Sequence, residues 1–344
     1  QLPATDYKFS VFRNITYGGE WYLVEVASGN FTIQRGATVP AEGLNIEAIV
    51  VLMQDKKPVY RASTQGIITI KNMRYLDTDT GEVKSRDVNV TFTIEKLPDG
   101  TQVMRFSSPL PAMLNYEIRM YVTHVTIGGR EVPLPKPFDV TPTLRRLGIF
   151  GTADLYKAPG LDFAELGLTS VVTIQATDSS GKPRADWKVQ VFYGDIIAAE
   201  DDGQVQTVLP RTDVTGIPYV VRVITNVMTP DGKPVVKEQA VDITQKVFSL
   251  RVPVATVKVV MQAVDGFGAV RNDWPVVVEN VASGMGQLEV ELVEGQQYVV
   301  RVTGLGFTNA TSFTARGPQM VVRVKIPTAK IAAQVVDGFG NVRS

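Results

Sequence analysis

Few residues in this sequence could carry out chemistry, and they do not form a recognisable catalytic motif. The chain has one histidine, His124, and no cysteine among its 344 residues. Zinc and iron–sulfur sites need several Cys or His ligands, so both are excluded. His124 could activate a Ser or Thr nucleophile, but no Gly-x-Ser-x-Gly elbow accompanies it. A histidine at a strand end, bonded to backbone or water, is the favoured interpretation, and no catalytic residue is assigned.

Carboxylates offer a second kind of chemistry. In Asp77-Thr78-Asp79-Thr80-Gly81 they alternate before a glycine. This resembles the start of a calcium loop, since Ca²⁺ takes oxygen ligands and needs a sharp turn. Val88 stands where the loop needs its last glutamate, so a plain hairpin turn is favoured. Calcium at Asp77 and Asp79 is the weaker alternative, and no other cofactor is expected. No carboxylate spacing singles out a glycosidase pair.

Four Asn-x-Ser/Thr sequons mark candidate sites of N-glycosylation, and they begin at Asn14, Asn30, Asn89 and Asn309. Asn89 is the most informative, because the alternation in 88–94 places apolar residues on one strand face and Asn89 on the other. A glycan fits on such a solvent-facing side. The sequence starts at Gln1 rather than Met, and we expect any signal or anchor to lie upstream. These features favour an extracellular location.

Composition and charge narrow the remaining classes. The 35 basic and 35 acidic residues give zero net charge, so the basic field of a nucleic-acid binder is missing and no nucleic-acid partner is expected. A hydrophobic content of 44% with 20% charged residues is too apolar for disorder. Without disulfides, stability must come from buried cores. No window approaches the roughly 20 apolar residues of a membrane helix.

Alternating apolar and polar residues predict an all-β fold along the whole chain. Valine, which favours strands, rises from 15 residues in 1–170 to 37 in 171–344, a step that indicates modules of different composition. Turn signals at Gly81, Gly100 and Gly128 separate several of these alternating segments. The only helix candidate is short, at 162–168. The strands predicted in the first half are 21–26, 46–52, 66–70, 88–94 and 116–122.

A repeated motif organises the second half. Val172–Gly181 is followed by Asp186-Trp187, and Val259–Gly268 by Asp273-Trp274. A third start spans Ala332–Arg343. Each motif is a strand that ends in an Asp-x-x-Gly turn, and we expect each tryptophan to anchor a sandwich core. The turn residues are Asp178 and Gly181, Asp265 and Gly268, and Asp337 and Gly340; the core anchors are Trp187 and Trp274.

The aspartates lie 87 and then 72 residues apart, lengths that suit one small β-sandwich per repeat. We therefore divide the chain into an N-terminal β-rich region (1–167), a first repeat (168–255), a second repeat (256–328) and the start of a third, incomplete repeat (329–344). Pro253 and Pro327 are predicted to stiffen matching junctions. A proline follows the turn only as Pro183, which predicts turns of a different type in the other copies. We expect the chain to continue past Ser344, rather than to complete the sheet of a neighbouring subunit.

The repeat resembles the bacterial and archaeal immunoglobulin-like repeats of surface proteins, whose first strand reads Val-x-Val-x-Asp-x-x-Gly. The form Val264-Asp265-Gly266-Phe267-Gly268 is similar to surface-layer and cell-surface proteins of thermophilic archaea. The resemblance covers about residues 168–344 and implies tandem immunoglobulin-like β-sandwich domains. Carboxypeptidase-regulatory-like and transthyretin-like modules share this start. Residues 1–167 match no family.

These observations favour a structural extracellular protein that assembles with itself into a surface layer or filament. Other surface proteins or glycans are further candidate partners. One alternative is an adhesin or glycan-binding stalk whose ligand is recognised by residues 1–167. A second alternative is a secreted glycoside hydrolase in which the repeats are spacers.

Overall fold

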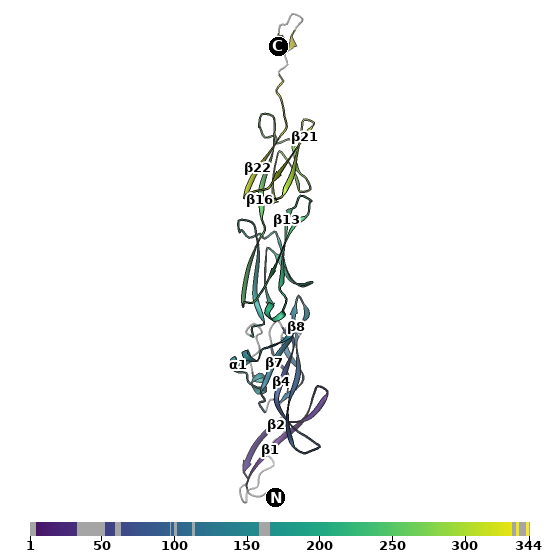
Figure 1. The fold of residues 1–344 in the computed structure, drawn as a ribbon, viewed down its shortest axis with the longest axis vertical. Helices are drawn as coiled ribbons and strands as arrows, with labels where there is room; N and C mark the ends of the chain where they lie inside the picture. Colours follow the sequence, from purple (N-terminus) through teal and green to yellow (C-terminus); the bar gives the residue numbers. More distant parts are fainter. Residues whose placement is uncertain are drawn as a thin grey trace.

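A computed structural model describes residues 5–32, 52–58, 63–96, 98–99, 102–111, 114–157, 166–331, 335–336 and 342–343. The molecule is elongated, with β-modules that follow one another from the N-terminus to the C-terminus (Figure 1). The predicted all-β class is confirmed, since the helices described are three short segments: α1 (Thr141–Arg146), α2 (Thr152–Lys157) and α3 (Thr212–Thr215). Residues 162–165 of the candidate helix and most of the predicted strand 46–52 lie outside the described residues, and residues 166–168 are described and not helical.

The described strands of the N-terminal region form one antiparallel sheet of eight strands. The order is β1-β2-β4-β5-β6-β3, and β7 pairs with β4 and β8. The strands are β1 (Asp6–Tyr17), β2 (Glu20–Thr32), β3 (Leu52–Pro58), β4 (Ser63–Leu76), β5 (Val83–Lys96), β6 (Gln102–Pro111), β7 (Ile118–Ile127) and β8 (Arg130–Asp139).

Strand β4 changes its partner at a bulge. Its first part, up to Ile70, pairs with β7, and its last two residues pair with β2. The register shifts between Ile70 and Met73, where Asn72 takes a left-handed φ of 49°. Asp87 holds this bend, because its carboxylate accepts the Asn72 N–H at 3.0 Å and pairs with Lys71, which lowers the pKa of Asp87. The side of β4 that does not face β5 therefore pairs with β7 before the bulge and with β2 after it.

Each repeat contains a three-stranded and a four-stranded sheet with the same connections. In the first repeat the sheets are β12-β9-β15 and β11-β10-β13-β14. In the second repeat the equivalent orders are β19-β16-β22 and β18-β17-β20-β21. One residue pair, Met228 with Leu292, links the two repeats through β13 and β19, so the four-stranded part of the first repeat and the three-stranded part of the second form one continuous seven-stranded sheet.

The first-repeat strands are β9 (Thr169–Thr177), β10 (Lys188–Tyr193), β11 (Ile196–Asp202), β12 (Gln204–Pro210), β13 (Tyr219–Met228), β14 (Pro234–Val241) and β15 (Val247–Pro253). The second-repeat strands are β16 (Thr256–Val264), β17 (Pro275–Val278), β18 (Ala282–Met285), β19 (Gln287–Val293), β20 (Gln297–Gly304), β21 (Phe307–Thr314) and β22 (Gln319–Lys325). Strands β9 and β16 share one pattern of buried and exposed positions. Beyond them, β23 (Val335–Val336) pairs with β24 (Val342–Arg343).

The two repeat tryptophans lie inside the sandwiches. Trp187 is fully buried and Trp274 is 3% exposed. An arginine lies over each ring, Arg184 at 4.2 Å and Arg271 at 5.2 Å from the ring centroid. The Trp187 Nε1–H donates to Asn226 Oδ1 at 3.1 Å. The indoles therefore contribute large apolar areas to the cores without leaving the Trp187 donor unpaired.

The Asp-x-x-Gly turns of the two repeats are alike. Asp178 Oδ1 accepts the N–H groups of Ser180 and Lys182, and Asp265 Oδ1 accepts those of Phe267 and Ala269 at the equivalent positions. Gly181 and Gly268 have φ values of 82° and 86°, which favour glycine. The predicted difference in turn type is therefore wrong, because the aspartate carboxylate fixes the turn whether or not a proline follows. Asp337 and Gly340 lie outside the described residues.

The two junction prolines are not equivalent, contrary to the sequence match. Pro253 is the last residue of β15 and pairs with Thr177. In the second repeat, Lys325 holds this place by pairing with Val264, and Pro327 lies two residues later. The sequence comparison aligned Pro253 with Pro327, whereas the register of the parallel strand pairs aligns Pro253 with Lys325.

Candidate functional site at the module junctions

The first repeat is longer than the second by 15 residues, and the strand pairings place this difference in three connections. The β10–β11 and β12–β13 connections are each four residues longer in the first repeat, and the β13–β14 hairpin is seven residues longer. In the first repeat these connections are bounded by residues 191 and 199, 210 and 219, and 224 and 236. The equivalent residues of the second repeat are 278 and 282, 293 and 298, and 303 and 308. All three extra segments lie at junctions with a neighbouring module.

Two of the extra segments contact the N-terminal region. Gly128, in the β7–β8 turn, approaches the β10–β11 hairpin so closely that a Cβ there would overlap the carbonyl oxygen of Ile197. Gly216, which ends α3 in the β12–β13 connection, lies against Pro135, whose Cγ would be 3.0 Å from an added Cβ. The N-terminal region and the first repeat also share one cluster of buried hydrophobic residues. Arg130 and Asp195 also pair across this junction, at 3.8 Å, but both side chains are exposed, so the junction is mainly an apolar, close-packed contact.

The third extra segment, the β13–β14 hairpin, contacts the second repeat. The Tyr298 hydroxyl donates to Met228 O and accepts the Val293 N–H, both at 3.0 Å. Burial raises the pKa of Tyr298, so the hydroxyl keeps its proton at neutral pH. Asn280 Nδ2 donates to Pro230 O at 3.0 Å. The second junction is therefore held by directed hydrogen bonds.

A charge pair crosses the same junction. Arg184 Nη1 donates to both carboxylate oxygens of Glu291, at 2.6 and 2.7 Å, and these side chains are only 15% and 20% exposed. Thr256 Oγ1 also donates to Glu291, at 2.5 Å. Arg184 pairs in addition with Asp186, and this bond lowers the pKa of Asp186 to about 2. Charge-assisted bonds of this kind fix orientation as well as distance.

The second repeat has the same arginine but uses it differently. Arg271 pairs with Asp273 in its own repeat, with 3.4 Å between Nε and Oδ1, and lies 3.9 Å from Asp265. Sequence reasoning missed these arginines, although a signal was present. An arginine stands six residues after each turn aspartate, as Arg184, Arg271 and Arg343.

A further contact recurs at both ends of the second repeat. Ser179, the residue after the first turn aspartate, donates its hydroxyl to Thr256 O at 3.0 Å. At the equivalent position, Gly266 N–H donates to Thr328 Oγ1 at 2.8 Å. Thr256 and Thr328 are separated by the second repeat period. The turn after the first strand is thus a contact point for the chain that follows each sandwich.

The four sequon asparagines all lie at exposed positions on strands. Asn89 Oδ1 accepts a hydrogen bond from the Thr69 hydroxyl at 2.8 Å, so its Nδ2, the atom that would carry a glycan, is not part of that bond. Asn309 differs, because its Nδ2, the atom that would carry a glycan, donates to Lys325 O at 2.7 Å. Asn14 and Asn30 lie on β1 and β2. Glycosylation at these four positions stays a prediction.

The other candidate residues lie apart from the junctions. Asp77 Oδ1 accepts the N–H groups of Asp79 and Thr80, and Oδ2 pairs with Lys84, which lowers the pKa of Asp77. Within the described part of the chain, no group of three or more His, Cys, Asp or Glu side chains could hold a metal. Half-buried His124 has its Nδ1 3.0 Å from the hydroxyl of Thr123. No helix among the described residues is long and apolar enough to cross a membrane.

No protein-family model and no curated protein matches the chain. Among solved structures, the Bacillus anthracis TIE protein is similar with a TM-score of 0.23 and 10% identity, over 85% of this chain and 59% of that one. A fimbrial protein from Bacteroides ovatus is similar with a TM-score of 0.25 and 9% identity, over 51% and 53% of the two chains. A leucine-rich repeat protein from Bacteroides thetaiotaomicron gives a TM-score of 0.16 and 10% identity, over 47% and 26%. The chain thus spans between about a quarter and three fifths of these proteins.

Proposed function

We propose that this chain is a structural extracellular protein, a component of a surface layer or filament that assembles with itself. In this role the described modules form a stiff rod that sets a distance and an angle. The role is mechanical and includes no chemical step. The exposed sequon positions support the extracellular part of the proposal.

The observation that carries the proposal is that the insertions of the first repeat are used at its junctions. Tandem domains move relative to one another unless their interface is large or specific. Here two residues, Val254 and Ala255, separate the last strand of the first repeat from the first strand of the second. A linker of this length cannot act as a flexible tether. With hydrogen bonds and a charge pair across the same junction, the two sandwiches are expected to behave as one body.

Exposed sheet edges support the self-assembly part of the proposal. Among the described strands, β14 and β21 each pair with one neighbour. The first six residues of β21 are all exposed. An unpaired edge presents N–H and C=O groups that a strand of another chain can pair with. A second copy of this protein is therefore the proposed partner.

Electron microscopy and small-angle X-ray scattering test the two parts separately. Microscopy of the purified chain is expected to show ordered sheets or fibres, and a sample that stays monomeric under all conditions would refute self-assembly. Scattering from the monomer is expected to fit a rod of fixed shape. A flexible ensemble of sandwiches would refute the spacer role even if assemblies form.

A matched pair of variants sharpens the scattering test. Arg184→Met removes the charge pair across the second junction, and Arg271→Met removes the equivalent arginine that stays within its own repeat. Arg184→Met is expected to broaden the distribution of angles between the repeats, whereas Arg271→Met leaves it unchanged. Equal effects of the two variants would show that the junction bond does not set the angle.

A further inference from the structure

Trp21 stands apart from the other two tryptophans. Trp187 and Trp274 are buried, whereas Trp21 is 69% exposed on β2, next to the tight turn at Gly18 and Gly19. An exposed residue of this size is informative when it adjoins a concave surface, because single exposed apolar residues are otherwise ordinary. Trp21 does adjoin such a surface.

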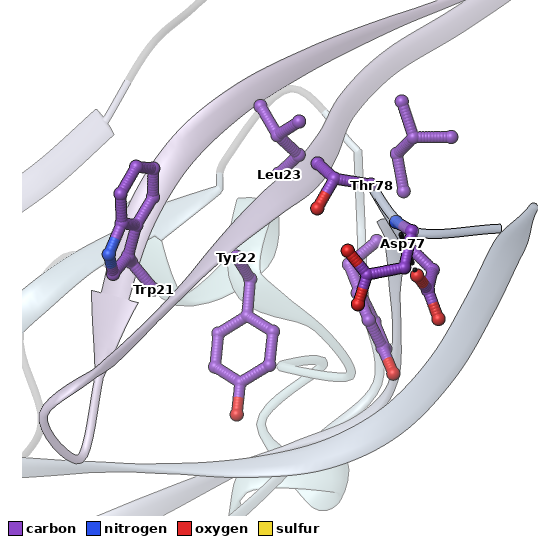
Figure 2. A pocket seen from close by; sticks show the side chains of 8 residues that line it. Trp21, Tyr22, Leu23, Asp77 and Thr78 are labelled. Atoms are coloured by element: carbon purple, nitrogen blue, oxygen red, sulfur yellow. Dashed lines mark hydrogen bonds between the residues drawn. The ribbon is translucent and has the colours of Figure 1, made fainter. Parts of the chain in front are cut away.

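A pocket of about 390 Å³ lies between the start of β2 and the end of β4. Its volume falls within the range of small-molecule sites, roughly 300–1,000 Å³. Figure 2 shows Trp21 at one side of the pocket and Asp77 with Thr78 at the other. The pocket exists because β2 and β4 share only two residue pairs after the bulge, and the chain then turns away at Asp77.

The aromatic wall of the pocket is held in place. The rings of Tyr22 and Tyr75 meet edge to face, with centroids 5.3 Å apart and an angle of 77°. Arg86 lies over the Tyr22 ring at 5.1 Å, and its Nη1 donates to the Tyr22 hydroxyl at 2.6 Å. These two rings beside Trp21 are therefore fixed, and a ligand that touches them orders no further side chain there.

The pocket combines one open aromatic face with polar groups of two kinds. The Asp77 carboxylate is occupied by turn amides and Lys84. Thr78 and Asp79 are exposed, and neither side chain makes a hydrogen bond within the described structure. The hydroxyl of Thr78 can donate or accept, and the carboxylate of Asp79 accepts.

We propose that this pocket binds a pyranose ring of a carbohydrate. A pyranose has a flat C–H face that fits the indole of Trp21, whose ring face carries partial negative charge. Its hydroxyls fit the oxygens of Thr78 and Asp79 at the rim. A cationic ligand fits less well, because the site has one open ring rather than an aromatic cage. Of the two carboxylates that line the pocket, Asp77 is already paired with Lys84, and only Asp79 is open to a ligand.

The carbohydrate site does not depend on the proposed rod and is tested separately. The full chain is titrated with the methyl glycosides of glucose, mannose, galactose and N-acetylglucosamine, and binding is followed by saturation-transfer NMR. At least one glycoside is expected to bind and to shift the emission of Trp21, because its indole moves from water to a covered position. Nα-acetyl-lysine methyl ester serves as the cationic probe.

Two variants locate the binding. Trp21→Ala is expected to weaken glycoside binding by about tenfold or more, since the stacked face and its buried area are lost. Phe307→Ala is the matched control, because Phe307 is also 69% exposed but lies on the second repeat. Asp79→Asn keeps the shape of the side chain and is expected to weaken binding less. The thermal midpoint of each variant shows that it is folded.

Three outcomes would overturn the inference. In the first, none of the four glycosides binds at concentrations up to tens of millimolar. In the second, a glycoside binds but Trp21→Ala weakens it no more than Phe307→Ala does. In the third, the lysine ester binds through Trp21 and the glycosides do not. None of these results bears on the rod, which is judged by scattering and microscopy.

Discussion

The two repeats share one sandwich and use it differently. Their strand orders, first-strand burial and turn bonds correspond, yet the first repeat has 15 more residues in its period. Those residues form no new strand, and they contact the N-terminal region on one side and the second repeat on the other. In this molecule the repeated motif sets the core, and the insertions set how the modules are joined.

The two junctions also differ in the forces that hold them. The junction of the N-terminal region with the first repeat continues one hydrophobic cluster, whereas the second repeat has a cluster of its own. Apolar contact is not directional. The hydrogen bonds and the Arg184–Glu291 pair between the repeats are directional. We infer that the first junction provides cohesion and the second provides a defined angle.

The largest effect is expected from emptying the two cores. Trp187→Ala and Trp274→Ala should each destabilise the protein by about 3–5 kcal/mol, through lost burial and the cavity left behind. Trp187 belongs to the cluster shared with the N-terminal region, and Trp274 to the separate cluster. Trp187→Ala should therefore lower the unfolding temperature of both the first repeat and the N-terminal region. Trp274→Ala should lower that of the second repeat alone.

Calorimetry with domain-specific probes measures this difference, and Trp21→Ala, at an exposed position, is the control for removing an indole. If Trp274→Ala destabilised all three modules equally, the separation of the two clusters would be wrong.

A smaller effect is expected at the first junction, where two adjacent glycines form a matched pair. Gly128 and Gly129 both have positive φ, 55° and 77°, so alanine is strained at either position by about 1–2 kcal/mol. Gly128→Ala should add about 1–3 kcal/mol, because its Cβ would overlap Ile197 O. A Cβ at Gly129 meets nothing within 4 Å. Urea unfolding of the two variants measures the difference, and equal stabilities would mean that the contact with the first repeat is not tight.

The second junction is tested through an equivalent pair of tyrosines. Tyr298 bonds Met228 of the neighbouring repeat, whereas Tyr219 donates to Pro210 O at 2.8 Å within its own repeat. Replacing either by Phe should lower stability by about 1–2 kcal/mol, because buried polar partners lose a bond. Only Tyr298→Phe should change the scattering profile of the rod. A change of profile with Tyr219→Phe alone would contradict the assignment of the junction.

The sequence predicted the fold class, because the alternation in strands such as 88–94 and the motif ending in Asp178 and Asp265 are local features. It also placed the repeat tryptophans nine residues after those aspartates, where the structure shows them buried. The turn type was predicted wrongly, since the proline at 183 was given more weight than the bonds of the aspartate carboxylate.

The junctions could not be predicted from the sequence, because their contacts join residues far apart in the chain. Arg184 and Glu291 are separated by more than one repeat period, and no local pattern pairs them. The pocket beside Trp21 was missed for a similar reason. It depends on the bulge at Asn72, which sends the end of β4 towards β2. The recurring arginine was visible in the sequence, but its partner in the next repeat was not.

The smallest effect is expected from acid, and it again separates the two repeats. Arg184 lowers the pKa of Asp186 to about 2, below the value near 3.9 of an unfolded aspartate. The pair therefore stabilises the fold above about pH 4, and this stabilisation is lost as the pH falls towards 2. Because Asp186 is 47% exposed and screened by solvent, the loss should stay below about 1 kcal/mol.

Urea unfolding of the wild type and Asp186→Asn at pH 5, 4, 3 and 2 should show curves that converge as the pH falls. Asp273→Asn, whose aspartate has its pKa lowered by Arg271 within the second repeat, should show a smaller convergence, because Asp273 is 66% exposed. Curves for Asp186→Asn that stay parallel to the wild type would mean that the bond to Arg184 does not lower the pKa of Asp186 in the folded protein.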